Sequence, residues 1–307
     1  MSSVFPALDV DDLPRVAAHL TGWPWRTPSN PDLPLTLASA GLPRISVVTP
    51  SFNQAQFLEQ TIRSVLLQGY PNLEYIVVDG GSTDGSVEIL KRYSPWLSWW
   101  VSERDRGQVD AINKGLQRAT GDWVGWQNSD DLYYPGALGD VARAVKADPS
   151  AALVAGNVDL IDVEGRVLTD LLYVRPTYRS MLAEGMVMTN QASFWRRDLH
   201  ASIGWLDETY PLGFDYEWFL RVLHAGSARH VDRTLGAYRI HADAKTARSL
   251  EQSGRERARI LAGRSLSRWA VQAYRLRRLG LLLAHGHLRY VMRALTRRAA
   301  GVRKDLL

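Results

Sequence analysis

The sequence contains no cysteine and no long apolar run. Without cysteine there is no disulfide, thiolate nucleophile or thiolate metal ligand, which fits a reducing compartment. The longest apolar candidate is LGLLLAHGHL at 279–288, which is shorter than the ~18 residues of a membrane span and is interrupted by His and Gly. The first residues, MSSVFPALDVDDLP, lack a basic region followed by an apolar one, so we expect no signal peptide.

Histidine is also sparse, with 7 residues in a chain of 307. Together with the absence of cysteine, this argues against a zinc site of the structural type. The net charge of +5 is unevenly distributed, because residues 246–307 hold 15 Lys and Arg against 3 Asp and Glu. The tail therefore carries +12 and the preceding part −7. An acidic body with a basic tail indicates two separate roles.

The middle of the chain alternates between expected strands and helices. Short β-branched or apolar runs predict strands at 44–49, 73–79, 97–102, 123–127 and 152–157. Helical spacing predicts helices at 53–69, with Asn53 as the cap, 107–121 and 136–148. This alternation indicates an α/β fold with βαβ units and a mostly parallel sheet. We divide the chain into a Pro-rich extension (1–43), two halves of one domain (44–156 and 157–245) and a basic helical tail (246–307).

Polar residues stand at the ends of three expected strands. They are Thr49, Pro50 and Ser51, then Asp79, and then the run Asn128, Ser129, Asp130 and Asp131. The carboxyl ends of parallel strands share one edge of the sheet, where ligands bind near the reversal of strand order. Two adjacent carboxylates repel each other, and Mg²⁺ or Mn²⁺ with phosphate oxygens is the usual compensation. The same run would also suit a plain turn and a helix N-terminus.

Two stretches in this order resemble the inverting glycosyltransferases of family 2. They are ISVVTPSFNQAQFLEQTIRSVLLQGYPNLEYIVVDGGSTDGS and DRGQVDAINKGLQRATGDWVGWQNSDD. The resemblance runs from about residue 44 to about residue 241 and rests on several motifs. It implies the GT-A fold, in which a Rossmann-like sheet is flanked by helices. Residues 44–156 would then form the half that binds the nucleotide-sugar, and 157–245 the half that binds the acceptor.

The resemblance also implies which residues surround the donor. They are Pro50, Ser51, Phe52, Asp79, Arg106, Asp110, Asn113 and Asp130. Asp79 would accept a hydrogen bond from the base, which is uracil in relatives that use UDP-sugars. Asp130 would contact the ribose, and Arg106 would bind the diphosphate. Asp79 has a second interpretation as the cap of the loop GGSTDGS, and Arg106 as part of a solvated helix start.

The implied metal motif is NSDD at 128–131. Asp131 would hold the Mn²⁺ or Mg²⁺ ion that bridges the diphosphate, and His241, in the closing loop, would be a ligand of the metal or the diphosphate. A lone histidine is more often structural. Asn128 stands where many relatives carry Asp, so we expect it to hydrogen-bond within the loop.

Asp215 aligns with the acid that serves as catalytic base in this family. Inversion needs one base, which removes the proton of the acceptor hydroxyl as its oxygen attacks the anomeric carbon. The N-terminus of the helix expected at 213–226 would keep Asp215 ionised, although an N-cap role alone is also possible. Glu217 is the reserve candidate. The resemblance places Gln191 and Phe194 toward the acceptor.

The tail is expected to form two helices, roughly 247–278 and 280–300, with a partial apolar stripe among many Arg residues. Three interpretations compete: a helix pair packed on the domain, a surface that lies on an anionic membrane, and a nucleic-acid site. We favour the membrane over nucleic acid, because the tail lacks interleaved aromatic residues for base stacking. The expected location is the cytoplasm, with peripheral association at the inner face of the cell membrane.

These inferences predict a metal-dependent inverting glycosyltransferase of the hexosyltransferase type. It would use a nucleoside-diphosphate sugar, UDP first, and a saccharide or lipid-linked saccharide acceptor of the bacterial envelope, with no nucleic-acid partner. One rival is an inactive GT-A protein that binds nucleotide as a partner subunit. A second rival, a nucleotidyltransferase, should carry a Gly/Arg/Lys-rich loop after the first strand, and TPSFNQAQF is not such a loop.

Overall fold

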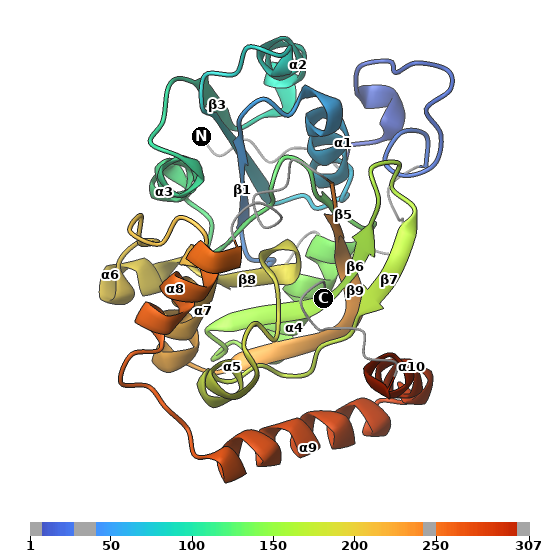
Figure 1. The fold of residues 1–307 in the computed structure, drawn as a ribbon. Coiled ribbons are helices and arrows are strands. Elements are labelled where there is room, and N and C mark those ends of the chain that lie inside the picture. The colour runs from blue at the N-terminus through green and yellow to red at the C-terminus, as the bar shows by residue number, and fades with distance from the viewer. Residues whose placement is uncertain (1–7, 28–40, 242–249, 300–307) are drawn as a thin grey trace.

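One mixed sheet of nine strands forms the centre of the structure (Figure 1). The computed structural model describes residues 8–27, 41–241 and 250–299. The strands are β1 (Ile45–Ser51), β2 (Leu73–Asp79), β3 (Trp99–Ser102), β4 (Trp123–Trp126), β5 (Leu132–Tyr133), β6 (Leu153–Ile161), β7 (Val167–Leu171), β8 (Ser193–Arg196) and β9 (Ala228–Arg239). Their order is β3-β2-β1-β4-β8-β6-β9-β5, and β7 pairs with β6.

Helices cover both faces of this sheet. They are α1 (Ala55–Leu66), α2 (Ser86–Tyr93), α3 (Gln108–Arg118), α4 (Ala137–Ala147), α5 (Tyr178–Glu184), α6 (His200–Ile203), α7 (Phe214–Ala225), α8 (Leu250–Ile260), α9 (Arg268–Ala284) and α10 (Leu288–Ala299). Alternate residues of β1 serve two cores: Val47 packs with α1 and α4 on one face, and Val48 with α3 and α7 on the other. A strand buried on both faces explains the unbroken apolar run in the sequence.

The first four strands are parallel, as predicted, and the rest of the sheet is mixed. β1 pairs in parallel with β2 and β4, and β2 with β3. β8 is antiparallel to β4 and β6, whereas β9 is parallel to β6. The chain moves outward from β1 to β3 and returns as β4 on the other side of β1, so the strand order reverses between β1 and β4. In such sheets this reversal is where ligands bind.

The start of α1 differs from the prediction. Asn53 lies outside the helix with a positive φ of 51° and does not cap it. Its Oδ1 accepts a hydrogen bond from the N–H of Thr83, and Asp84 Oδ2 accepts one from the N–H of Ala55 at 2.8 Å. The cap therefore comes from the loop after β2, which local spacing does not reveal, and this loop is held close to Phe52.

The tail forms three helices, α8, α9 and α10, where the sequence predicted two. Gly263 and Gly286, both with positive φ, lie in the breaks between them. Leu282 of α9 and Val291 of α10 pack against Val174, and Figure 1 shows α9 beneath α5, far from β1–β3. Residues 242–249 of the predicted closing loop and tail and residues 300–307 lie outside the described part. No helix within the described part has the length and apolarity to cross a bilayer.

Candidate active site

The segment after β1 presents an aromatic ring at the carboxyl edge of the sheet. Pro50 and Ser51 are buried, whereas Phe52 is 58% exposed. Gly80 packs against it, since a Cβ there would lie 3.2 Å from Phe52 Cδ2 and 2.5 Å from Asp105 Oδ2. A larger residue at this position would therefore displace the side chains of Asp105 and Phe52. Phe52 thus offers an exposed ring beside the end of β2, of the kind on which a nucleobase stacks.

Asp79 is fully buried at the end of β2, and its carboxylate binds the loop that follows. Oδ2 accepts hydrogen bonds from the N–H groups of Gly81 (3.1 Å) and Ser82 (2.9 Å) and from Ser102 Oγ (2.6 Å). Oδ1 accepts one from Ser82 Oγ. Asp79 is therefore the cap of this loop. Its role as acceptor for a base stays a prediction, for which Oδ1 retains acceptor capacity.

Asp130 and His241 meet beyond the carboxyl end of β4. His241 Nε2 lies 2.9 Å from Asp130 Oδ2. The imidazole packs beside Phe57, with ring centroids 5.2 Å apart. A carboxylate oxygen and an imidazole nitrogen at this separation form a donor pair that fits a divalent cation, with water and phosphate oxygens at the remaining positions.

Asp131, predicted as the metal ligand, is instead engaged in the interior, with 1% of its surface exposed. Its Oδ1 accepts a hydrogen bond from the N–H of Arg239, and its Oδ2 accepts from Gln191 Nε2 (2.7 Å) and Asn128 Nδ2 (2.9 Å). Burial, and next the charge of Asp130, raise the pKa of Asp131 well above its ordinary value. Because its oxygens are occupied, the geometry favours Asp130 over Asp131 as the cation ligand. The expected hydrogen bond of Asn128 within the loop is confirmed.

Arg239 fixes the loop that carries the two aspartates. Its buried guanidinium donates from Nε to the carbonyl of Asp130 (2.7 Å) and from Nη1 to those of Asp162 (2.9 Å) and Val163 (3.0 Å). Nη2 donates to Gln60 Oε1 at 2.7 Å. The loop thus has a fixed shape and a buried positive charge beside it. That charge partly compensates the two adjacent carboxylates.

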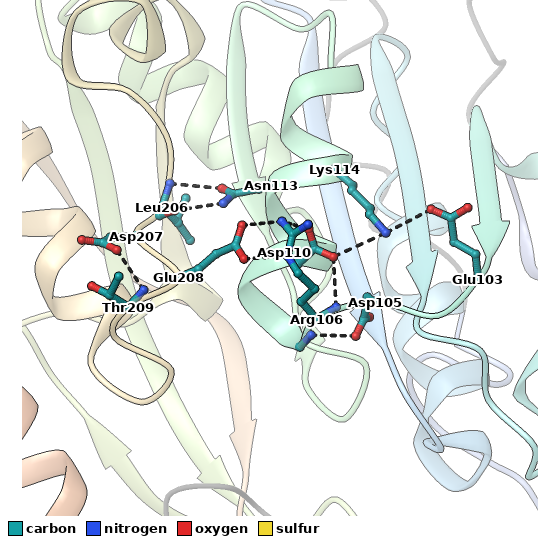
Figure 2. A network of polar contacts seen from close by, with 11 residues as sticks. Glu103, Asp105, Arg106, Asp110, Asn113, Lys114, Leu206, Asp207, Glu208 and Thr209 are labelled. Carbon is teal, nitrogen blue, oxygen red and sulfur yellow. Dashed lines mark hydrogen bonds and ion pairs between the residues drawn. The ribbon is translucent and has the colours of Figure 1, made fainter.

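The start of α3 carries a polar network that reaches the loop before α7 (Figure 2). Arg106 Nη2 pairs with Asp110 Oδ1 (2.8 Å) and with Glu208 Oε1 (2.9 Å), and its side chain is largely exposed. Asn113 donates to the carbonyl of Leu206 and accepts from its N–H, at 2.9 and 3.1 Å. Asn113 therefore anchors that loop instead of facing a donor. Placement of Arg106 and Asp110 near a donor stays a prediction.

The two residues predicted to face the acceptor lie inside the protein. Phe194 has no exposed surface and packs against Tyr133, with ring centroids 5.6 Å apart. It also abuts Gly125, where a Cβ would come within 2.9 Å of Phe194 Cδ1. Both faces of β8 are covered, because Phe194 packs into the apolar cluster on one side of the sheet and Trp195 into the cluster on the other side. Gln191 is also buried, and it serves Asp131 instead of an acceptor.

Asp215 lies in the first turn of α7, where Oδ1 accepts a hydrogen bond from the N–H of Tyr216 at 2.6 Å. Burial raises the pKa of Asp215 to about 6, against the lowering effect of the N–H groups. Burial therefore outweighs the expected effect of the helix N-terminus on this pKa, but the expectation that Asp215 is ionised at neutral pH still holds. A carboxyl group with this pKa is ionised at neutral pH and is a stronger base than an exposed aspartate.

Glu217, the reserve candidate, is already engaged. Its carboxylate forms a bidentate pair with Arg221, through Nε at 2.7 Å and Nη2 at 2.7 Å. Asp215 makes no ion pair with any residue that the structure describes. This contrast favours Asp215 over Glu217 as the base.

Glu256 of α8 supports the start of α7, and it was not identified from the sequence. Its Oε2 accepts hydrogen bonds from the N–H groups of Leu212 (3.0 Å) and Gly213 (2.8 Å), and Gln252 Nε2 holds its Oε1 at 2.9 Å. Local spacing could not show this, because 43 residues separate Gly213 from Glu256. The one feature of the sequence that could have drawn attention to Glu256 is that it is an acidic residue within a basic tail.

Several buried polar atoms near the carboxyl edge have no hydrogen-bond partner among the described residues. They are Ser51 Oγ, Gln127 Nε2 and Oε1, Thr189 Oγ1, Asn190 Nδ2 and Gln191 Oε1. They come from the ends of β1 and β4 and from the turn before β8. An unpaired buried polar atom costs roughly 1–3 kcal/mol, so a ligand or ordered water is its usual partner. This supports a polar ligand at the edge where Asp130 lies.

Comparisons with known proteins place the chain among the glycosyltransferases. The family model described as glycosyl transferase family 2 matches residues 46–196. An uncharacterized glycosyltransferase of Mycobacterium tuberculosis is 35% identical over 184 residues, which are 58% of this chain and 68% of the relative.

Two solved structures share the fold. TarS of S. aureus in complex with UDP-GlcNAc superposes with a TM-score of 0.59 at 18% identity, covering 71% of this chain and 66% of that one. The mannosyltransferase PcManGT from Pyrobaculum calidifontis, in complex with GDP-Man and Mn²⁺, gives 0.55 at 20% identity, covering 86% and 82%. Among the relatives found by sequence, the M. tuberculosis glycosyltransferase is matched over about two thirds of its own length.

Proposed function

The chain belongs to glycosyl transferase family 2, and on that basis we propose that it transfers a sugar, with inversion, from a nucleoside-diphosphate sugar to a hydroxyl acceptor. The observation that carries the proposal is the Asp130–His241 pair beyond β4, next to the reversal of strand order. Donor binding is assigned to 44–156 and acceptor binding to 157–245. Phe52 would stack the base, and Asp79 Oδ1 would accept its N–H; UDP is our first choice of nucleotide.

Asp130 and His241 would hold Mn²⁺ or Mg²⁺, which when bound would neutralise charge on the departing diphosphate. Asp215 performs the proton transfer. Its carboxylate takes the proton of the acceptor hydroxyl as that oxygen bonds to the anomeric carbon, while the bond from that carbon to the diphosphate oxygen breaks on the opposite face. One displacement of this kind inverts the anomeric configuration and yields a nucleoside diphosphate.

For the acceptor we propose a saccharide or lipid-linked saccharide of the bacterial envelope, with the tail at an anionic membrane surface. The support is a row of exposed apolar side chains on α9, Trp269, Leu276 and Leu283, among Arg residues. They are seven residues apart and share one face of the helix. The buried Leu282 packs on the domain, so α9 can dock and still present this row.

The test is a thermal-shift panel of UDP, GDP, dTDP, CDP and ADP, each with and without Mn²⁺. Ligand at about 100 times its dissociation constant adds about 2.7 kcal/mol of stability. We expect a shift with one nucleotide that requires metal and is lost in Asp130→Ala. No shift with any nucleotide would overturn the donor site. If the protein binds a nucleotide but neither hydrolyses nor transfers any matching sugar donor, the result would instead support the inactive partner subunit. Inversion is tested separately, by determining the anomeric configuration of the product by NMR.

A further inference from the structure

A second cluster of metal-binding side chains lies where the tail meets the sheet. Asp232 of β9 and two residues between α9 and α10, His285 and His287, bring one ligand atom each within 4.8 Å of one another. His287 Nε2 lies 2.9 Å from Asp232 Oδ1, and His285 Nδ1 lies 4.0 Å from Asp232 Oδ2. This cluster is separate from Asp130 and shares no residue with the donor site.

The fold assembles the cluster from two short motifs, HVD at 230–232 and HGH at 285–287. His230 and Asp232 of β9 both reach the side chain of Asn157, at a point where the pairing of β6 with β9 is irregular. Gly286, at a φ of +82°, makes the turn that joins α9 to α10 and places a histidine on either side of it. A residue with a side chain is strained in this conformation.

Asn157 holds the strand side of the cluster in place. Its buried amide donates from Nδ2 to Asp232 Oδ1 at 3.1 Å, and its Oδ1 lies 3.3 Å from His230 Nε2. The ring of His230 stacks over that of His285, with centroids 6.5 Å apart. Hydrogen bonds of this kind orient metal ligands in proteins and fix their geometry.

We propose that Asp232, His285 and His287 bind a divalent transition metal of the zinc class. Two imidazole nitrogens and one carboxylate oxygen are a donor set that zinc uses, with water or a further ligand in fourth position. In tetrahedral coordination with bonds of 2.0–2.1 Å the ligand atoms are roughly 3.3 Å apart. The contacts of 2.9, 3.2 and 4.0 Å bracket this separation. The proposal departs from the expectation drawn from sparse histidine, because the fold brings Asp232 beside the two histidines of the HGH motif, which lie far from it in the sequence.

The bound metal joins the tail to the catalytic domain. The other contacts of α9 and α10 with the domain include the apolar cluster of Leu282, Val291 and Val174 and two ion pairs, Arg293 with Asp170 at 2.9 Å and Arg278 with Glu184 at 3.7 Å. A metal bridge from β9 to the α9–α10 turn fixes both helices at once. The tail's exposed apolar row is then held in one orientation relative to the active site.

The test uses the full chain carrying Asp130→Ala, so that metal at the donor site does not contribute. After chelator treatment, Zn²⁺ binding is measured by calorimetry, and Co²⁺ is added to record its visible spectrum. We expect one equivalent of Zn²⁺, a tetrahedral Co²⁺ spectrum, and slower tryptic cleavage of the Arg-rich α9–α10 segment when Zn²⁺ is bound. His287→Ala and Asp232→Asn should each weaken Zn²⁺ binding at least 100-fold.

The matched control is His19→Ala, which removes an exposed histidine near the N-terminus, far in the sequence from the three proposed ligands. It should leave Zn²⁺ affinity unchanged. Circular dichroism of the metal-free variants verifies that each is folded. Absence of Zn²⁺ binding in the parent overturns the proposal and leaves the cluster as an ion-paired contact. Binding that survives in both His287→Ala and Asp232→Asn also overturns it, since the metal would then lie elsewhere.

Discussion

Asp130 and His241 are 111 residues apart in the sequence and 2.9 Å apart in the structure, oxygen to nitrogen. Asp131, directly beside Asp130, is engaged by Arg239, Asn128 and Gln191 in the interior. The two neighbouring carboxylates therefore have different tasks. In the proposed function Asp130 would offer an oxygen to a cation, whereas Asp131 organises the loop from inside.

This difference predicts that substitutions of the two aspartates have different effects, one on metal binding and the other on stability. Asp130→Ala and His241→Ala each remove a donor atom, so both should lower Mn²⁺ affinity more than tenfold and abolish the metal-dependent nucleotide shift. EDTA should mimic them in the wild type, and added Mn²⁺ should reverse it. Asp131→Asn should mainly reduce thermal stability, because its partners lose a charged acceptor. A folded Asp131→Asn protein without metal dependence, beside an unaffected Asp130→Ala protein, would contradict the assignment.

Asp215 should control the rate and its pH dependence. A general base contributes about 10²–10⁴-fold, so Asp215→Asn should reduce kcat by that order with nucleotide affinity unchanged. Because the pKa of Asp215 is raised to about 6, kcat/KM should rise with pH and level off above that value. Glu217→Gln is the matched control, and its pH profile should keep the same midpoint. Full transfer by Asp215→Asn would exclude this base.

The raised pKa of Asp215 also makes a prediction about stability. The folded state binds this proton more tightly than the unfolded state, so stability declines as pH rises from about 4 to about 6 and stays lower above. The difference from the ordinary value of 3.8 corresponds to roughly 3 kcal/mol at neutral pH. Asp215→Asn should thus raise the unfolding free energy at pH 7.5 and change it little at pH 4. Equal denaturation midpoints for both proteins at pH 7.5 would refute this.

Glu256 should act on the reaction through Asp215. Glu256→Ala leaves the N–H groups of Leu212 and Gly213 without their carboxylate, at a cost of roughly 2 kcal/mol in stability. The displaced helix start should also expose Asp215 and move the midpoint of the pH–rate profile below 6. Glu251→Ala, on the exposed side of α8, is the control and should change stability by less than about 0.5 kcal/mol. A Glu256→Ala protein that is less stable but has an unchanged pH–rate profile would leave Glu256 a purely structural role.

The strands β1–β4 could be predicted because their information is local. Buried parallel strands read as apolar runs, and the chain then places polar residues at their carboxyl ends. The roles of those residues could not be predicted in the same way. Phe194 looks like a surface aromatic until Tyr133 is placed against it, and Asn113 looks like a site amide until Leu206 is placed beside it.

The contacts between the tail and the rest of the domain could not be predicted from the sequence either, because they join residues that are far apart in the chain. Glu256 and the cluster of Asp232, His285 and His287 depend on contacts over 43 to 55 residues. Composition did show that the tail was basic, but not that one of its acids holds the start of α7. Contacts of this length follow from how the helices dock, and docking depends on the whole apolar surface.

The exposed row on α9 predicts membrane binding that depends on both apolar contact and charge. Trp269 is 86% exposed and Leu276 67% exposed, and Arg residues flank them. Burying two large apolar side chains in a bilayer interface contributes about 1.5–3 kcal/mol each, so Trp269→Ala/Leu276→Ala should weaken binding to anionic vesicles on the order of 100-fold. Added salt should also weaken binding of the wild type to these vesicles, because Arg residues bind the headgroups.

Leu168→Ala, on the exposed β7, is the control in the same co-sedimentation assay and should bind like the wild type. If wild type and double variant sediment equally with the vesicles, the row on α9 does not contact lipid, and any binding to the vesicles must come from the Arg residues.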